Sequence, residues 1–216
     1  MIELFNVSKT YKLKSGRKTI LNGVTASIPW KNIGVLGRNG AGKSTFLRLI
    51  SGIEEPDSGI VKRSKSFSWP IGFRGSFHPM LSGIENVRFV ARLYGQNTEE
   101  MIDKVEDFAE LGQFFYEPVK TYSSGMGARL AFGLSMAIKF EVFLVDEVMA
   151  VGDAKFQAKS KAAFKAMLPT SKIIMVSHSM SSIREYCDAG LVIDNGRMTY
   201  FEDLDEAIAR YEELNK

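Results

Sequence analysis

"GRNGAGKS", at residues 37–44, fits the pattern G-x-x-x-x-G-K-[ST]. The residues before it, "NIGVLG" (32–37), form the apolar run of a short buried strand, and those after it, "STFLRLISG" (44–52), have the spacing of a helix. A strand that enters a glycine loop and leaves it as a helix is the context in which this pattern binds phosphate. The glycines let successive backbone N–H groups wrap around an anion. The stretch therefore predicts a nucleotide-binding P-loop in an α/β domain.

Several positions of the loop have an expected role. Lys43 supplies a flexible positive charge, the Ser44 hydroxyl is a ligand for Mg²⁺, and the helix that begins there points its positive end at the phosphates. Chance alone produces the four fixed positions in about one chain in a hundred of this length. The residues expected to bind the nucleotide are Gly37, Arg38, Asn39, Gly40, Ala41, Gly42, Lys43, Ser44 and Thr45.

A second expected strand ends in two carboxylates. In "VFLVDE" (142–147), four apolar residues precede Asp146 and Glu147, at the edge where a parallel sheet binds ligands. An acidic pair after a strand is often only a helix cap, but a P-loop in the same chain favours a catalytic role. We expect Asp146 to hold the magnesium ion and Glu147 to polarise the attacking water.

His178 ends a third strand-like run, "IIMVSH" (173–178). A histidine in this place is more often a packed or capping residue than a catalytic one. In a chain with two phosphate-site motifs, however, its imidazole is well placed to reach a γ-phosphate or to orient water. We therefore expect His178, Glu147 and Lys43 to form the catalytic set.

The run that starts "YSSGM" (122–126) precedes a long apolar stretch that reads as a helix. Its serines favour an N-cap, because their side chains accept hydrogen bonds from the first free N–H groups. They also favour an anion site, because a helix start with small residues can receive a phosphate. The run has no lysine of its own, so the phosphate has to come from elsewhere.

Composition argues for a globular protein that does not bind nucleic acid. The chain has 216 residues, of which 45% are apolar and 25% charged, and its net charge of +3 is mild. One basic cluster is expected to be a solvated hairpin: it comprises Lys9, Lys12, Lys14, Arg17 and Lys18. The single cysteine, Cys187, suits a reducing cytosol and is expected to pack in the core. No run reaches the roughly 18 apolar residues of a membrane span, and the start is not a signal peptide.

Strand and helix patterns alternate along most of the chain. Strands are expected near residues 2–7, 24–28, 32–37, 60–61, 141–146, 172–178 and 190–194, with a hairpin turn at 194–197. Helices are expected near residues 44–52, 84–95, 98–112, 122–140 and 203–214, and also between the last three of these strands. The pattern predicts a single α/β domain with N-terminal antiparallel strands and a mostly parallel core sheet. Its core would be residues 1–78 and 141–216, and a helical subdomain would be inserted at about 79–140.

Together these motifs resemble the ATP-binding subunits of ABC transporters, in matching order across nearly the whole chain. Residues 37–44 match the Walker A motif, and Asp146 and Glu147 match Walker B and the catalytic carboxylate. His178 matches the switch histidine, and Asp153, in "AVGD", matches the D-loop aspartate. The resemblance implies a P-loop NTPase fold, Mg²⁺ and ATP as cofactors, and stacking of Tyr11 on the adenine.

The resemblance also gives the "YSSGM" run a role. It falls where the family carries its signature, usually L-S-G-G-Q, with Tyr122 in place of the leucine. The implied signature residues are Ser123, Ser124, Gly125 and Met126. They would close an ATP molecule bound by a second copy, so that a homodimer sandwiches the nucleotide. One family feature is missing, because residues 66–86 contain no glutamine, and Phe73, Phe77 or His78 occupies that region.

Other stretches narrow the resemblance. "SWPIGFRGSFHPMLSGIENVRFVARLYG" (68–95) and "DEVMAVGDAKF" (146–156) are similar to subunits that energise bacterial capsular-polysaccharide export. This implies an ATP-hydrolysing subunit on the cytoplasmic face of the inner membrane, bound to a separate integral membrane permease that handles the polysaccharide. The alternatives are an O-antigen or teichoic-acid exporter ATPase, and a soluble ABC ATPase without a transport role. A P-loop GTPase or kinase is disfavoured because no N-K-x-D motif is present. A non-catalytic regulatory module is disfavoured because Glu147 and His178 are present.

Overall fold

The computed structural model describes residues 1–14, 16–71, 77–146, 153–177 and 179–215. They form two compact units. The core unit comprises Met1–Pro70, Glu141–Glu147 and Thr170–Lys216, and the helical unit comprises Ile71–Phe140 and Val148–Pro169. The helical unit thus begins earlier than the inserted subdomain expected at residues 79–140, and it also takes in a helix from the later segment.

The main sheet of the core unit is mostly parallel, as predicted. Its strand order is β5-β6-β7-β3-β8-β9, and every neighbouring pair is parallel except β8 and β9. The strands are β5 (Phe67–Pro70), β6 (Val142–Asp146), β7 (Lys172–Val176), β3 (Ile33–Leu36), β8 (Ala189–Asp194) and β9 (Arg197–Phe201). The last two are joined by the predicted hairpin, where Asn195 and Gly196 both have positive φ (47° and 77°).

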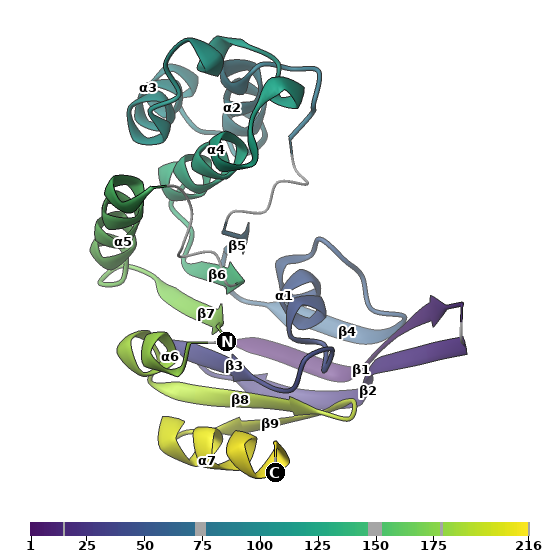
Figure 1. Cartoon of the computed structure of the whole chain (residues 1–216). Helices are drawn as coiled ribbons and strands as arrows, with labels where there is room; N and C mark the ends of the chain where they lie inside the picture. Colours follow the sequence, from purple (N-terminus) through teal and green to yellow (C-terminus); the bar gives the residue numbers. More distant parts are fainter. Residues whose placement is uncertain (15, 72–76, 147–152, 178, 216) are drawn as a thin grey trace. The chain divides into compact units, whose positions relative to one another are not determined.

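Helices pack on this sheet and bury its central strand. All four residues of β3 are buried, as expected for a parallel strand covered on both faces. α1 (Lys43–Ser51) contacts β5, β6 and β7, and α7 (Leu204–Leu214) contacts β3, β8 and β9 (Figure 1). α6 (Met180–Tyr186) approaches β3 so closely that a Cβ on Gly34 would lie 2.9 Å from Ile183 Cγ2. Cys187, the C-cap residue of α6, is buried, which confirms the expected packing role. Burial raises the pKa of its thiol to about 12.

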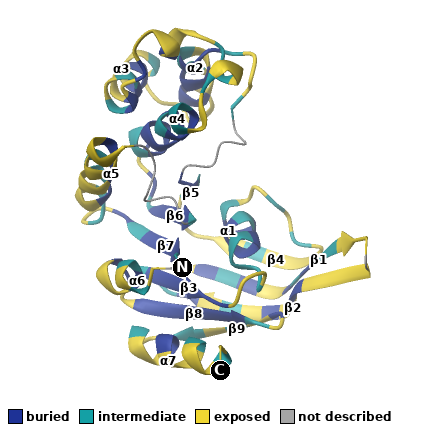
Figure 2. Cartoon of the chain, in the orientation of Figure 1, coloured by how far each residue is buried: buried dark blue, intermediate teal, exposed yellow. Residues whose placement is uncertain are grey.

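A second, antiparallel sheet contains the two N-terminal strands that precede the P-loop, as predicted, and one strand that follows it. Its order is β2-β1-β4, with β1 at Ile2–Leu13, β2 at Gly16–Ile28 and β4 at Ser58–Arg63. Buried residues of β1 and β2 form one hydrophobic cluster with residues of α1 and of the main sheet. Figure 2 shows the buried strands β3 and β8 of the main sheet and the exposed hairpin end of β1 and β2.

The prediction that all five residues of the basic cluster are solvated is wrong for Lys9, which is buried. A register shift lies between Leu4 and Val7, where Asn6 takes a positive φ of 51°. Such a bulge inserts one extra residue into β1, so that the inward-facing side chains stand at even-numbered positions before it and at odd-numbered positions after it. Lys9 is therefore buried beside Val7, whereas the other four basic residues of the cluster, Lys12, Lys14, Arg17 and Lys18, are exposed as expected.

The helical unit has a core of its own. Its helices are α2 (Gly83–Leu93), α3 (Thr98–Ala109), α4 (Ser124–Ala137) and α5 (Ala154–Met167), with short 3₁₀ turns at Gly112–Tyr116 and Val119–Thr121. The Phe108 ring centroid lies 5.6 Å from those of Phe132 and Phe156, which joins α3, α4 and α5. Ser82 and Glu85 form a capping box that fixes the start of α2. In the described part of the chain, no helix is long and apolar enough to cross a membrane.

Candidate nucleotide-binding site

The glycine loop passes too close to its neighbours to carry side chains at two positions. A Cβ on Gly37 would lie 2.5 Å from the carbonyl oxygen of Ile193, and one on Gly42 would lie 2.2 Å from Ile20 Cγ2. Gly42 is the N-cap of α1, with φ of 109° and no side-chain cap. The first N–H groups of α1 therefore have no capping side chain and remain suited to an anion.

Lys43 lies across this loop. Its Nζ donates hydrogen bonds to the carbonyl oxygens of Gly37 at 2.7 Å and Arg38 at 3.2 Å. The ammonium group is therefore held within the loop, where an incoming phosphate would meet both its charge and the loop amides. The nucleotide-binding role of residues 37–45 stays a prediction.

Ser44 and Asp146 are brought together from opposite halves of the sequence. Ser44 Oγ, in the first turn of α1, donates to Asp146 Oδ1, at the end of β6, over 3.3 Å. Hydroxyl and carboxylate oxygens are ligands that Mg²⁺ prefers, and the ion usually takes its remaining ligands from phosphates and water. Among the described residues, no cluster of three or more His, Cys, Asp or Glu could hold a metal. The two oxygens therefore fit an ion that arrives with a nucleotide.

The two other predicted catalytic residues, Glu147 and His178, lie outside the described residues. The strands that precede them are described: β6 ends at Asp146 and β7 ends at Val176. β7 lies between β6 and β3, and all three are parallel. The carboxyl ends of β6, β7 and β3, where β3 enters the P-loop, thus share one edge of the sheet, the usual place for ligands in such folds.

Tyr11 lies in a network of charges that the sequence did not reveal. Its Oη is 2.7 Å from both carboxylate oxygens of Glu54 and 3.3 Å from Nη2 of Arg48. Lys9 Nζ makes an ion pair with Glu54 at 3.0 Å. The Tyr11 ring is half-buried against the hydrophobic cluster of the core unit. Its adenine-stacking role remains a prediction.

Lys18 is a second residue whose position the sequence did not reveal. It is the direct cross-strand neighbour of Tyr11. Its Nζ is 2.9 Å from the place that a Cβ on Gly40 would occupy, so its ammonium lies over the P-loop. The sequence shows that Lys18 is basic, but only the register of β1 and β2 brings it to the loop.

The signature residues begin α4 in the helical unit. Ser123 is its N-cap, and the Ser123 side chain accepts a hydrogen bond from the Met126 N–H at 3.2 Å. The capping role of Ser123 is thus confirmed. Ser123 and Ser124 are exposed, and Gly125 and Met126 are half-buried. The start of α4 is therefore accessible to a ligand, and its role toward a second copy stays a prediction.

Tyr122 fixes the loop in front of α4. Its hydroxyl donates to the Phe114 carbonyl at 2.7 Å, and burial raises its pKa to about 12. A Cβ on Gly83 would lie only 2.5 Å from the same hydroxyl. Where the family usually carries a leucine, this chain therefore has a tyrosine that ties the signature run to the start of α2.

Asp153 begins α5 and contacts α4. Its side chain accepts a hydrogen bond from the Phe156 N–H at 2.9 Å, and this bond, more than the charge of Arg129, lowers its pKa. Arg129 Nη2 is 2.7 Å from Asp153 Oδ2, and the Arg129 guanidinium lies 4.7 Å from the Phe156 ring centroid. Asp153 thus joins the signature helix to the residues that follow the predicted D-loop.

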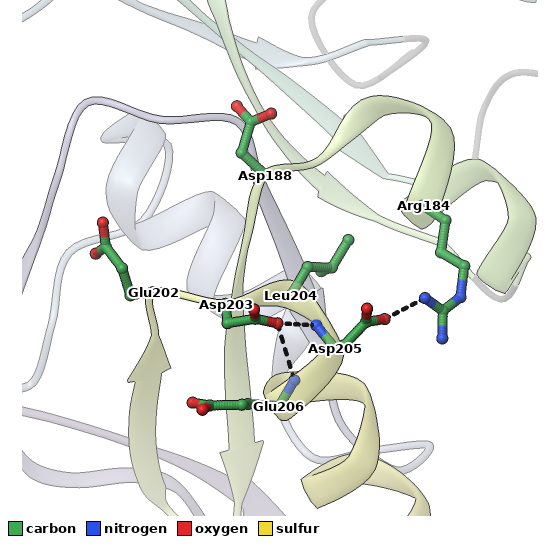
Figure 3. Close-up of a pocket in the computed structure, with 7 residues that line it drawn as sticks. All are labelled: Arg184, Asp188, Glu202, Asp203, Leu204, Asp205 and Glu206. Atoms are coloured by element: carbon green, nitrogen blue, oxygen red, sulfur yellow. Dashed lines mark hydrogen bonds and ion pairs between the residues drawn. The ribbon is translucent and has the colours of Figure 1, made fainter.

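A separate pocket of the core unit is unsuited to phosphate. Figure 3 shows its lining at the start of α7, where Asp203 caps the helix through the N–H groups of Asp205 and Glu206 and where Arg184 pairs with Asp205. The pocket, of about 530 Å³, is lined by Arg184, Asp188, Glu202, Asp203, Leu204, Asp205 and Glu206. Five carboxylates against one guanidinium would repel an anion. None of the predicted site residues lines it.

Comparison with known proteins gives the family of the chain. The family described as "ABC transporter" matches residues 21–150. The protein BexA of Haemophilus influenzae, described as an ATP-binding protein, is 48% identical over the full length of both chains. The capsule polysaccharide export ATP-binding protein CtrD of Neisseria meningitidis is 47% identical, over 99% of this chain and 100% of its own. The polysialic acid transport ATP-binding protein KpsT of Escherichia coli is 48% identical, over 98% of this chain and 96% of its own.

Solved structures show the same fold at low sequence identity. An ATP-binding subunit of an ABC transporter aligns over 100% of both chains with a TM-score of 0.79 and 20% identity. The cassette MJ0796, in a dimeric structure with ADP and Pi, aligns over 93% of this chain and 98% of its own with a TM-score of 0.75 and 20% identity. The sequence relatives establish the family, and the structures establish the ABC ATPase fold. The chain therefore belongs to the ABC transporter family, as an ATP-binding ATPase subunit.

Proposed function

We propose that the chain powers the export of capsular polysaccharide across the bacterial inner membrane by hydrolysing Mg-ATP. The observation that carries the ATPase part is the convergence of Lys43, Ser44 and Asp146 at one edge of the core sheet. The cargo is inferred from relatives: CtrD is a capsule polysaccharide export protein and KpsT a polysialic acid transport protein, at 47% and 48% identity. An O-antigen export protein, RfbB of Klebsiella pneumoniae, is less similar at 34%.

The chain's own residues would mainly position and stabilise charge. Loop amides and Lys43 would hold the phosphates, while Ser44 and Asp146 would hold Mg²⁺. When bound, Mg²⁺ neutralises charge on the β- and γ-phosphates. Glu147 would accept a hydrogen bond from the attacking water and direct it in line with the scissile bond, and His178 would contact the γ-phosphate or the same water.

The signature run supports a homodimer with ATP at its interface. Ser123 and Ser124 are exposed at the start of α4, and the run carries small residues but no lysine. In a dimer, the partner's P-loop would supply the lysine and the phosphates. Ser123 would then cap α4 in the monomer and contact the γ-phosphate in the dimer. The likeness to MJ0796, whose structure is dimeric, is consistent with this arrangement.

An apolar surface on the helical unit supports a membrane partner. Met80, Phe89 and Leu93 are 58%, 59% and 68% exposed, and the last two lie four residues apart on one face of α2. Beside them is a pocket of about 360 Å³ lined by Phe77, His78, Pro79, Leu81, Asn86 and Phe89. We propose that a permease subunit contacts this surface and holds the chain at the cytoplasmic face of the membrane.

This surface lies in the region that lacks a glutamine. His78 is held at both its backbone and its side chain: its backbone N–H donates to Asn86 Oδ1 at 2.8 Å, and its imidazole Nδ1 accepts from the Met80 N–H at 3.3 Å. Phe77 and His78 line the pocket together. Phe73, the third candidate for this region, lies outside the described residues. We propose that Phe77 and His78 replace the glutamine in contact with the permease.

Complementation tests the function as a whole. A capsule-export strain that lacks its own ATPase subunit would receive this chain or its Lys43→Ala variant, and surface capsular polysaccharide would be measured. We expect the native chain to restore the capsule and Lys43→Ala to fail, with equal protein levels in both. Restoration of O-antigen but not of capsule in a parallel O-antigen export mutant would overturn the choice of cargo. ATP hydrolysis by the purified chain that Lys43→Ala leaves intact would overturn the ATPase site.

A further inference from the structure

The bulge in β1 turns two unlike side chains to the interior. After the register shift at Asn6, two further shifts fall between Val7 and Lys9 and between Lys9 and Thr10, and Lys9 and Tyr11 both turn toward the side on which Val7 is buried. Val7 is fully buried, Lys9 is 11% exposed at its side chain, and Tyr11 packs against the hydrophobic cluster. A lysine is rarely buried unless it is paired. The residues that pair with Lys9 therefore explain why it is buried beside Tyr11.

Those partners are acidic residues of the loop that follows α1. Lys9 Nζ lies 3.0 Å from Glu54 and 3.5 Å from Asp57, and it donates to the Glu55 carbonyl at 2.7 Å. Burial alone would lower the pKa of Lys9, but the hydrogen bonds and charges of Glu54 and Asp57 together outweigh it and raise the pKa. Burial would raise the pKa of Glu54, yet hydrogen bonds from Tyr11, Lys9 and Arg48 lower it. Both groups are thus charged at neutral pH.

Glu54 links Tyr11 to the helix of the P-loop. Its carboxylate accepts the Tyr11 hydroxyl at 2.7 Å and Arg48 Nε at 3.1 Å, and its backbone N–H donates to the Arg48 carbonyl at 3.2 Å. Arg48 Nη2 in turn lies 3.3 Å from both the Tyr11 hydroxyl and Thr45 Oγ1. Thr45 belongs to the stretch predicted to bind the nucleotide. A continuous set of hydrogen bonds therefore runs from the Tyr11 ring to the phosphate end of α1.

Stability alone does not account for this network. A partly buried ion pair contributes little net stability, because desolvation offsets much of the attraction, and apolar residues of similar size often serve as well. The network does, however, hold an aromatic ring by its edge. A ring that stacks on a base needs a fixed position, and a hydroxyl bound to a charged carboxylate gives the Tyr11 ring one. Lys9 Nζ also lies 5.7 Å from the centroid of this ring.

We propose that Glu54 is a positioning residue for the nucleotide base: with Lys9 and Arg48 it holds the Tyr11 ring at the distance from the P-loop that ATP requires. This inference rests on the proposed stacking of Tyr11 on adenine. Glu54 itself does not touch the nucleotide. Its effect should therefore appear in the affinity for nucleotides that have a base and be absent for phosphate chains that have none.

The experiment compares ATP with inorganic tripolyphosphate as competitors for a fluorescent ATP analogue at equilibrium. Glu54→Gln, which leaves an uncharged acceptor, and Tyr11→Phe, which removes the donor, should each weaken ATP binding about fivefold, the net worth of a typical hydrogen bond, and leave tripolyphosphate binding unchanged. The double variant should lose little more than either single variant, because both changes act on the same contact. If Glu54→Gln fails to fold, Tyr11→Phe, which removes only the hydroxyl, decides the matter.

A matched control is present on β9 of the same unit. Tyr200 Oη lies 3.0 Å from Glu202, which also pairs with Lys31, so this trio repeats the hydrogen bond and ion pair of Tyr11, Glu54 and Lys9 around an exposed carboxylate. Tyr200→Phe and Glu202→Gln should leave the affinity for ATP unchanged. A loss like that of Glu54→Gln in these controls would show a general effect of charge removal and would overturn the positioning role.

Other outcomes separate this inference from the proposed function. Equal loss of affinity for ATP and tripolyphosphate in Glu54→Gln would show a purely structural role and would overturn the inference. Tyr11→Ala with unchanged ATP affinity would overturn base stacking, and with it this proposal. If Tyr11→Ala weakens ATP binding while Tyr11→Phe and Glu54→Gln do not, the positioning role alone is wrong. Unchanged ATP affinity in Lys43→Ala would instead overturn the ATP site.

Discussion

Ser44 Oγ lies 3.3 Å from Asp146 Oδ1, although the two residues are 102 positions apart in the chain. The contact is made because β6 and the helix α1 meet at the same edge of the core sheet. This contact joins two motifs that are separate in the sequence: the glycine loop at residues 37–44 and the acidic end of β6. The predicted role of Ser44 and Asp146 as ligands of Mg²⁺ can therefore be tested by substitution.

Asp146→Asn should leave the fold intact but impair the use of magnesium. The amide keeps the shape and can still accept the Ser44 hydroxyl, but it removes the negative charge that favours a divalent cation. We expect the dependence of ATP hydrolysis on Mg²⁺ to shift to at least about tenfold higher concentrations, in line with the loss of a charged ligand. Titration of Mg²⁺ at constant ATP measures this, with Asp188→Asn, in the acidic pocket, as control. A superimposable titration curve would remove Asp146 from the metal site.

Glu147→Gln should separate binding from turnover. The substitution removes the carboxylate that would accept a proton from water but leaves the P-loop unchanged, so ATP affinity should stay within about twofold while hydrolysis falls by roughly a hundredfold or more. The trapped ATP should also hold the dimer together. Light scattering with saturating ATP should therefore show twice the monomer mass for this variant. Persistent monomer under these conditions counts against the sandwich arrangement, and near-normal hydrolysis counts against Glu147 as the base.

The sequence predicted the parts of the fold in which local pattern and tertiary context agree. The P-loop, β6, β7 and the hairpin at residues 194–197 were confirmed, because each carries an apolar run or a turn pair that few other structures allow. β5 was not predicted, because Phe67–Pro70 is short, contains a proline and forms only by pairing with a distant strand, β6. Parallel pairing of this kind leaves little trace in a local window.

The sequence proposes site residues where they follow one another in a motif, and it misses contacts between residues that are distant in the chain. Residues 37–45 form one continuous motif, and Asp146 follows a recognisable strand. Lys9 was expected to be solvated because nothing in the sequence marks the bulge at Asn6 that turns it inward. Glu54 joins Tyr11 across 43 residues of sequence, a contact that only the fold creates.

Gly83→Ala should destabilise the helical unit through the signature run. The new Cβ would lie 2.5 Å from the Tyr122 hydroxyl and 2.9 Å from the Phe115 carbonyl oxygen, and the second contact is with backbone that cannot turn away. We expect a loss of about 1–3 kcal/mol, typical of overpacking. Tyr122→Phe alone should cost about 1 kcal/mol, since it removes the hydrogen bond to Phe114.

In the double variant Gly83→Ala, Tyr122→Phe, part of the clash is gone, so the combined loss should be smaller than the sum of the two. Urea unfolding of all four proteins measures these values, and Gly125→Ala, whose Cβ would meet only Ser123 Oγ at 3.9 Å, shows what a glycine-to-alanine change does without a clash. Additive losses would mean that the Tyr122 hydroxyl does not limit the space at Gly83.

The last prediction concerns stability in acid. The pKa of Glu54 is lowered below its ordinary 4.5 because hydrogen bonds from Tyr11, Lys9 and Arg48 outweigh burial, which alone would raise it. A lowered pKa in the folded state contributes stability that is present above pH 4.5 and is lost as the pH falls through the folded value. The Glu54→Gln variant has no carboxyl group at this position that could titrate. The melting temperature of the native chain should therefore exceed that of the variant at neutral pH, and the gap should close below pH 4.5. Glu202→Gln, with an exposed carboxylate, should show a much smaller gap. A difference between the native chain and Glu54→Gln that stays constant from pH 7 into the acid range would show that the Glu54 charge contributes nothing to the fold.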